Sequence, residues 1–273
     1  MYVFFDGKII NDEKINISSM SESILYGYGL FETIKVCRGK MYFFDEHINR
    51  MKAGCKLIDL DFMLNIKNIK MSCEEIIKAN ELKFGAIRIS YLKNNVKNNE
   101  SYCTLITVRN NIYTENIYDK GFKLCFSNIK RNPYSPIVKV KSNNYIENIL
   151  ARKKAHDRGY NEALFLNVYD KICEGTVSNI FFIKDREIYT PSLKCGILEG
   201  IVRNKVIEIV QNLNIKINFG EYEKDMLYEA DEIFLTNSLM DIMPVSEIEG
   251  RKINLKNNKI TRLLMKELQN LYR

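Results

Sequence analysis

The chain has 273 residues, of which 46% are hydrophobic and 27% charged, so it can bury a sizeable core in one large or two smaller domains. No apolar run approaches the ~20 residues of a membrane-spanning helix, and the start MYVFFDGKII lacks the regions of a signal peptide, which predicts a cytoplasmic protein without membrane partners. The net charge of +7 comes from 41 basic and 34 acidic side chains that are interspersed, which disfavours nucleic-acid binding and suits attraction of a small anionic molecule.

The seven cysteines are odd in number and include no C-x-x-C pair. This pattern favours isolated reduced thiols, mostly in the core, over disulfides. It also predicts that the protein has no metal site.

The N-terminal stretch reads as β-structure followed by a helix. Residues 2–5 and 8–10 flank Asp6-Gly7, the strongest short signal for a β-hairpin. Residues 33–37 and 41–44 read as strands, and a helix is expected after Asp45, a good N-cap. One face of that helix would carry apolar residues, namely Ile48, Met51, Cys55 and Ile58.

His47 and Arg50 lie three residues apart on this helix and so share a face. Taken alone, His47 reads as a structural histidine and Arg50 as an exposed arginine.

The middle of the chain predicts a helix over residues 66–79 and strands over 86–92 and 102–108. The Asn-rich residues 93–101 between these strands form either an inert surface loop or one that overhangs an active site. Residues 109–120 read as an interdomain connection and 122–127 as the next strand, so we expect α/β domains over 1–115 and 116–273.

Two lysines, Lys139 and Lys141, precede a helix that ends at Gly159. Its expected apolar side carries Tyr145, Ile146, Ile149, Leu150 and Ala155. Either lysine is equally consistent with an ordinary surface position.

Residues 174–203 combine an acid with a candidate anion-binding site. Glu174 stands at a strand end, residues 180–183 and 187–190 form a hairpin around Asp185-Arg186, and a helix begins at Gly200. The first N–H groups of such a helix and its dipole favour a phosphate. A strand over residues 232–235 then leads into the loop TNSLMDIMPV, and an apolar-faced helix bearing Ile260, Leu263, Leu264, Leu268 and Leu271 closes the chain.

The spacing Glu174-x-Thr176-x-x-Asn179-Ile180-Phe181, Ile188-x-Thr190 and Leu198-x-Gly200-Ile201-x-Arg203 resembles the signature of the class IV aminotransferases, the fold-type IV pyridoxal phosphate enzymes. The similarity extends from Tyr26 to Val245. It implies an α/β (α+β) fold of two domains with the cofactor between them, and a homodimer whose partner chain completes the site. The second domain would be a distorted pseudo-barrel that carries the cofactor lysine.

The resemblance also implies the cofactor contacts. Lys141, with Lys139 as the fallback, would bind pyridoxal 5'-phosphate covalently and serve as general base, and Glu174 would face the ring nitrogen. The phosphate would be held by Arg50 in His47-Ile48-Asn49-Arg50, by the N–H groups of Ile201 and Val202, and by Asn237 and Ser238. Tyr145 would bond the ring's phenolic oxygen or else be a core tyrosine.

Substrate choice follows from local departures within the family. Phe31 stands where the D-amino acid enzymes carry a tyrosine, and residues 93–101 lack their Arg-x-His pair, which disfavours D-amino acid transamination. The segments around Lys141, Tyr189 and Asn237 look most like 4-amino-4-deoxychorismate lyases, which make 4-aminobenzoate for folate biosynthesis. A branched-chain transaminase is the alternative, and a non-catalytic protein that keeps the fold is a third possibility.

Overall fold

The computed structural model describes residues 1–94 and 101–272. Contacts between residues group the chain into two units. The first contains Met1–Ile112 and Val140–Asn144, and the second contains Tyr113–Lys139 and Tyr145–Arg273. Residues 95–100 of the Asn-rich loop lie outside the described residues. Asn94 N–H donates to Ser101 O (2.8 Å), where the described chain resumes.

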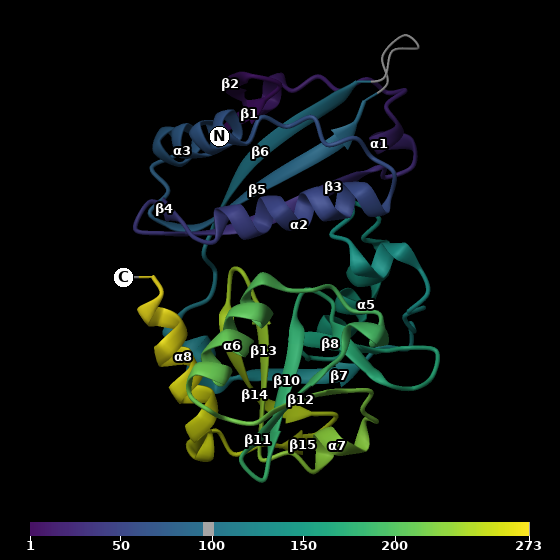
Figure 1. Cartoon of the computed structure of the whole chain (residues 1–273), viewed down its shortest axis with the longest axis vertical. Helices are drawn as coiled ribbons and strands as arrows, with labels where there is room; N and C mark the ends of the chain where they lie inside the picture. The colour runs from purple at the N-terminus through teal and green to yellow at the C-terminus, as the bar shows by residue number, and fades with distance from the viewer. Residues whose placement is uncertain (95–100, 273) are drawn as a thin grey trace. The chain divides into compact units, whose positions relative to one another are not determined.

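Within the described residues, the first unit is a six-stranded antiparallel sheet of order β2-β1-β6-β5-β3-β4 (Figure 1). Helix α2 packs on β3, and α3 packs on β1 and β6. The strands are β1 (Tyr2–Phe5), β2 (Lys8–Asn11), β3 (Gly29–Cys37), β4 (Lys40–Met41), β5 (Phe84–Lys93) and β6 (Tyr102–Asn110). The helices are α1 (Glu22–Leu25), α2 (Phe44–Leu57) and α3 (Ile66–Ala79).

Local predictions for this unit are mostly confirmed. Asp6 and Gly7 have φ of 44° and 86°, as a two-residue hairpin between twisted strands requires, and α3 spans the predicted residues. The predicted N-cap is wrong, because α2 begins at Phe44 and Asp45 lies in its first turn. The cause is Phe43, whose left-handed φ of 59° turns the chain early and buries Phe44.

The candidate lysine lies in a short segment that pairs with the start of β3. Phe31 N–H donates to Lys141 O (2.8 Å), Asn143 N–H donates to Gly29 O (3.0 Å), and Leu30 forms an antiparallel bridge with Ser142. By these contacts Lys141 belongs with the N-terminal unit, although the chain on both sides of the segment belongs to the second unit.

The second unit is a mixed, curled sheet of nine strands among the described residues, ordered β12-β11-β10-β13-β14-β7-β8-β9, with β15 paired to β14. Its strands are β7 (Phe122–Phe126), β8 (Glu162–Leu166), β9 (Ile172–Gly175), β10 (Asn179–Lys184), β11 (Glu187–Pro191), β12 (Ile217–Gly220), β13 (Glu232–Asn237), β14 (Asp241–Ile248) and β15 (Arg251–Lys252). Its helices are α4 (Glu115–Lys120), α5 (Ile146–Asp157), α6 (Ile201–Asn212), α7 (Asp225–Tyr228) and α8 (Lys259–Asn270).

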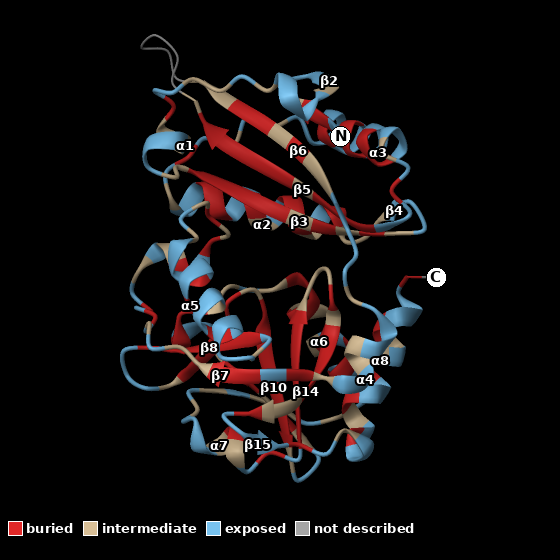
Figure 2. Cartoon of the chain, turned by 180° about the vertical axis from the view of Figure 1, so that it is seen from behind, coloured by how far each residue is buried: buried red, intermediate tan, exposed pale blue. Residues whose placement is uncertain are grey.

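The core of this unit lies on both faces of its central strands, which are coloured as buried in Figure 2. Phe181 of β10 and Phe234 of β13 stack with their ring centroids 4.9 Å apart. On the other face Phe182 stacks on Tyr189 of β11 with centroids 5.2 Å apart. These layers pack β10 against β13 and β11, and Asn237, a predicted site residue, lies at the end of β13.

The predicted apolar face of α5 is wrong for its three large aliphatic residues and confirmed for Ala155. Ile146, Ile149 and Leu150 are exposed, whereas the helix buries Asn148, Ala151 and Ala155. The small alanines let the helix approach β8 closely, and Asn148 is buried because its side chain bonds a turn of the sheet, described below. Among the described helices, none is both long and apolar enough to cross a bilayer.

Candidate active site

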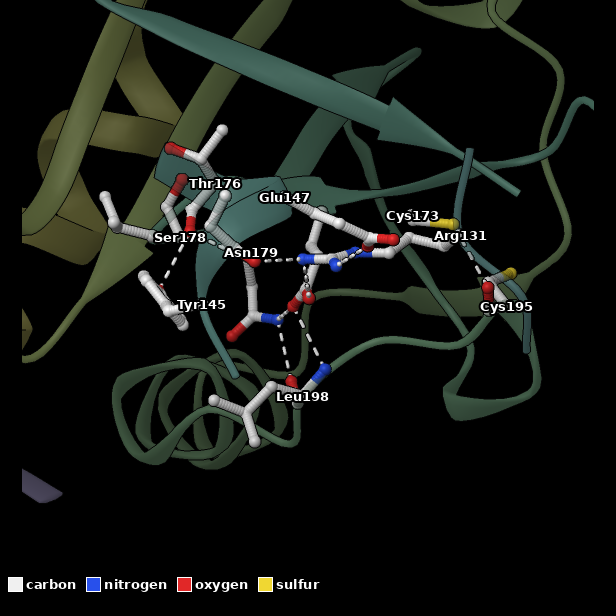
Figure 3. Close-up of polar contacts among 12 residues, drawn as sticks. Arg131, Tyr145, Glu147, Cys173, Thr176, Ser178, Asn179, Cys195 and Leu198 are labelled. Carbon is white, nitrogen blue, oxygen red and sulfur yellow. Dashed lines mark hydrogen bonds and ion pairs between the residues drawn. The ribbon is translucent and has the colours of Figure 1, made fainter. Parts of the chain in front are cut away.

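Glu174 is held by the loop that leads into α6. It is buried at the end of β9, and its Oε2 accepts a hydrogen bond from Leu198 N–H (3.0 Å). Asn179 at the start of β10 donates to Leu198 O (2.8 Å), and its Nδ2 lies 3.5 Å from the same carboxylate oxygen (Figure 3). The acid and the start of the helix are therefore joined through both backbone groups of Leu198.

Arg131 lies beside this carboxylate and is almost fully buried. Its Nη2 is 3.8 Å from Glu174 Oε1 and donates to Asn148 Oδ1 (3.0 Å), while Nη1 donates to Glu147 (3.0 Å; Figure 3). The guanidinium also lies 4.0 Å from the ring centroid of Phe165. Arg131 therefore places a permanent positive charge beside the Glu174 carboxylate.

The start of α6 has the properties of an anion-binding site. Its N-cap Gly200 supplies no side-chain cap, so the helix leaves the N–H groups of Ile201 and Val202 without intrahelical acceptors. A Cβ at Gly200 would lie only 2.0 Å from Asn179 Oδ1, so the backbone approaches the sheet more closely than any other residue type permits.

Two buried polar atoms near this anion-binding site have no hydrogen-bond partner within the described residues. One is Thr236 Oγ1, on a residue that pairs directly with Asn179 and so faces the same side of the sheet. The other is Nε of Arg203, in the first turn of α6, whose Nη2 donates to Pro191 O (3.2 Å). A hydroxyl and a guanidinium N–H left unsatisfied beside a helix N-terminus fit a phosphate group.

Tyr145 and Asn237 converge on one turn. The Tyr145 hydroxyl donates to Thr176 O (2.9 Å), and Asn148 Nδ2 donates to the same oxygen (2.6 Å). Burial, followed by the charge of Glu174, raises the pKa of Tyr145, so its hydroxyl keeps its proton. Asn237 Nδ2 donates to Val177 O (3.2 Å).

The other end of the Asn237 amide shapes the loop that carries Ser238. Asn237 Oδ1 accepts from Leu239 N–H (2.9 Å) and Met240 N–H (2.8 Å). The Asn237 side chain therefore holds the loop in place. Ser238 follows it directly and is partly buried.

In the first unit, Arg50 forms a bidentate pair with a buried acid. Its Nε and Nη2 donate to the two oxygens of Glu32 (2.8 and 2.6 Å), and His47 Nδ1 is 2.7 Å from Glu32 Oε2. Burial raises the pKa of Glu32, but the charges and hydrogen bonds of Arg50 and His47 outweigh it and lower that pKa to about 2. Because an ionised Glu32 can only accept, the His47 proton sits on Nδ1.

The charges of both Arg50 and Lys141 act on His47. Burial lowers the pKa of His47, Glu32 opposes that shift, and the charges of both Arg50 and Lys141 lower it further. The neutral imidazole thus lies within electrostatic range of both cations, and it is a structural histidine with its ring fully buried.

Lys141 and a second cation, Arg88, both lie against the Phe31 ring. Its Nζ lies 4.4 Å from the centroid of the Phe31 ring, and the guanidinium of Arg88 lies 3.6 Å from the same centroid. Arg88 is fixed by bonds to Ser90 Oγ (3.2 Å) and Asn143 Oδ1 (3.1 Å). By contrast, Lys139 is exposed at the end of a short 3-10 turn.

The structure thus gathers Tyr145, Glu174, the start of α6 and Asn237 in the second unit, and Arg50 and Lys141 in the first. The sequence did not mark Glu32 and Arg131, a buried acid and a buried arginine that no periodicity singles out. Asn179 was inside the signature but had no assigned role. No cluster of His, Cys, Asp or Glu able to hold a metal occurs in the part of the chain that is described.

Comparison with known proteins gives consistent results. Residues 29–248 match the family described as Amino-transferase class IV. The chain is 27% identical to the aminodeoxychorismate lyase of Bacillus subtilis, over 98% of this chain and 95% of that one. It is 31% identical to a probable branched-chain-amino-acid aminotransferase of Aquifex aeolicus, over 99% and 91% of the two chains.

Among solved structures, a putative 4-amino-4-deoxychorismate lyase from Legionella pneumophila superposes with a TM-score of 0.86 at 27% identity, covering 96% of this chain and 98% of that one. These matches and the geometry of the site support the same conclusion. The chain belongs to the class IV aminotransferase family and is a two-domain, fold-type IV enzyme that depends on pyridoxal 5'-phosphate.

Proposed function

We propose that this enzyme is a 4-amino-4-deoxychorismate lyase, which splits its substrate into 4-aminobenzoate and pyruvate. The observation that carries the proposal is the pair of cations on the Phe31 ring, Arg88 and Lys141. The substrate bears two carboxylates besides its amino group, and a guanidinium beside the reacting lysine suits such an anion. The similarity to the lyase of Bacillus subtilis over nearly the whole chain supports this choice.

In this proposal the residues predicted from the sequence would hold the cofactor. Lys141 would form the covalent bond to it, and Glu174 would face its ring nitrogen. Tyr145 would bond its phenolic oxygen. Its phosphate would be bound by Arg50, by the N–H groups of Ile201 and Val202, and by the loop of Asn237 and Ser238. The unsatisfied Thr236 hydroxyl and Arg203 Nε described above support a phosphate at the start of α6.

The bound pyridoxal phosphate supplies an electron sink that makes the substrate's C–H bond acidic. Lys141 Nζ takes the proton from the amino-bearing carbon, as a general base held against Phe31. Glu174, whose carboxylate lies 3.8 Å from Arg131 Nη2, would hold a proton on the ring nitrogen.

The reaction balances without an oxidant or an amino acceptor. The electron pair of the broken C–H bond forms a ring double bond while the neighbouring C–O bond to the enolpyruvyl group breaks. The ring becomes aromatic 4-aminobenzoate, and the departing enolpyruvate takes up a proton and becomes pyruvate.

A branched-chain transaminase is the second candidate, favoured by the 31% identity to the Aquifex aeolicus protein. Arg88 would then bind the side-chain carboxylate of glutamate as amino donor. A chain that binds no cofactor and acts only as a binding protein is the third candidate.

Product assays distinguish the three. The lyase predicts equal amounts of pyruvate and 4-aminobenzoate from aminodeoxychorismate with no keto acid added, and none from Lys141→Ala. Glutamate formed from branched-chain amino acids and 2-oxoglutarate, without pyruvate from aminodeoxychorismate, would establish the transaminase instead. A colourless protein that takes up no pyridoxal phosphate would refute both enzymes.

We also propose that the enzyme works as a cytoplasmic homodimer, as the family resemblance implies. Light scattering of the purified chain should give twice the mass of 32.0 kDa, and a mass equal to one chain would refute the dimer.

A further inference from the structure

Glu162, at the start of β8, is a buried carboxylate to which neither the sequence signature nor the proposed reaction gives a role. One of its oxygens accepts from Ala163 N–H (3.0 Å), Thr176 N–H (3.1 Å) and Thr176 Oγ1 (2.5 Å). The other accepts from Val177 N–H (3.3 Å) and Ser178 Oγ (3.4 Å). Glu162 therefore bonds every residue of the Thr176–Val177–Ser178 turn.

This turn stands between Glu162 and the predicted cofactor contacts. Four of its donors point to Glu162, while the carbonyls of Thr176 and Val177 accept from other side chains. Thr176 O accepts from Tyr145 and Asn148, and Val177 O accepts from Asn237. Figure 3 shows Tyr145 directed at Thr176 and Ser178 beside it.

The turn has little freedom to take another shape. Gly175 N–H donates to Ser178 O (2.7 Å), and a Cβ at Gly175 would lie 2.3 Å from Ser178 Oγ and 3.2 Å from the Glu162 carboxyl carbon. The turn is thus packed directly on Glu162. Losing the acceptor would leave five converging donors around one buried site, and the turn would have to rearrange.

We propose that Glu162 is a positioning residue for the cofactor: by holding the Thr176–Ser178 turn, it sets the hydroxyl of Tyr145 and the Asn237 loop in place to receive pyridoxal phosphate. The inference rests on the cofactor of the family and not on the choice between lyase and transaminase. Burial raises the pKa of Glu162, and the hydrogen bond from Thr176 and the charge of Arg152 oppose that shift.

A buried carboxylate can also serve stability alone, so the test needs a matched control. Glu232 is a second buried carboxylate of the same unit. It accepts from Ile260 N–H (3.1 Å) and Thr261 N–H (2.7 Å) at the start of α8, away from the Thr176 turn in the sequence and in its hydrogen bonds. Glu162→Gln and Glu232→Gln make the same substitution at two buried carboxylates of one unit.

The experiment measures the dissociation constant of pyridoxal phosphate from the apoenzyme by absorbance, together with Tm. Both variants should have a lower Tm than the wild type. Only Glu162→Gln should also raise the dissociation constant of pyridoxal phosphate, by about tenfold or more. Equal weakening in both variants at equal loss of Tm would reduce Glu162 to a purely structural role and overturn the proposal.

Two further variants keep the test decisive if Glu162→Gln does not fold. Thr176→Val removes one donor without changing volume and should weaken cofactor binding several-fold, whereas unchanged binding would overturn the proposal. Tyr145→Phe should weaken binding in the wild type and have a smaller effect in combination with Thr176→Val. Strict additivity would show that the turn does not act through Tyr145. A wild-type chain that binds no cofactor would overturn the cofactor assignment itself.

Discussion

Replacing Gly200 by alanine should disrupt the link between Glu174 and α6. Gly200 has an ordinary φ of −72°, so alanine brings no backbone strain, and the whole effect comes from a new Cβ 2.0 Å from Asn179 Oδ1. Asn179 cannot move away without losing its 2.8 Å bond to Leu198 O, since it is buried between the sheet and the helix.

The magnitude follows from that bond. A buried amide that loses its partner costs about 1–3 kcal/mol, and the weaker approach of Asn179 to Glu174 adds up to ~1 kcal/mol. We expect Gly200→Ala to lower stability by about 1–4 kcal/mol, which for a unit of this size is a fall in Tm of about 2–16 °C. Cofactor binding should weaken as well, because the first N–H groups of α6 move with Leu198.

The assay is a double-mutant cycle with Asn179→Ala, read by thermal unfolding and by cofactor titration. Asn179→Ala removes the atoms that the new Cβ would strike, so adding Gly200→Ala to it should have little further effect, with a coupling of at least about 1 kcal/mol. A change in Tm below 2 °C for Gly200→Ala, or additivity of the two variants, would refute the steric argument.

Three other predictions concern the charged groups. Because the pKa of Glu32 falls from 4.5 to about 2 in the folded protein, its ionised form contributes about 3 kcal/mol to the free energy of unfolding above pH 4.5. This contribution is lost as the pH falls from 4.5 towards 2. Denaturant unfolding between pH 2 and 7 should show this pH dependence in the wild type and not in Glu32→Gln. Arg50→Met leaves that buried carboxylate without its cation and should destabilise the chain by about 3–5 kcal/mol, partly restored by adding Glu32→Gln. Glu174→Gln should keep the hydrogen bond from Leu198 N–H and therefore have a nearly normal Tm. It should slow the exchange of the substrate's C–H proton with deuterated water at least about 100-fold. An unchanged exchange rate would contradict the role of Glu174 at the ring nitrogen.

The sequence predicted best those features that local chemistry determines. The bounds of α3 and the start of α6 at Gly200 follow from apolar periodicity and from a helix start that needs no side-chain cap. The Asp6-Gly7 and Asp185-Arg186 turns both adopt the left-handed φ that such hairpins require.

The sequence was less informative where distant residues decide the outcome. Periodicity predicted that Ile146 and Ile149 would be buried, yet α5 buries Asn148 because that amide bonds both Arg131 and the carbonyl of Thr176. Such a bond depends on residues far apart in the chain. For the same reason the sequence assigned Glu162 no role, because four of its five donors reach it only once the Thr176 turn has folded onto β8.

The segment of Val140–Asn144 also bears on how the protein is made. Its bonds to Gly29 and Phe31 cover the first half of β3 along the edge opposite β5, where β4 does not reach because it pairs only with Val36 and Cys37. During synthesis on the ribosome, that strand edge therefore emerges more than a hundred residues before its covering strand does. Nascent chains that stop short of Asn144 should present an open β-edge to one another and should be the species most prone to aggregate.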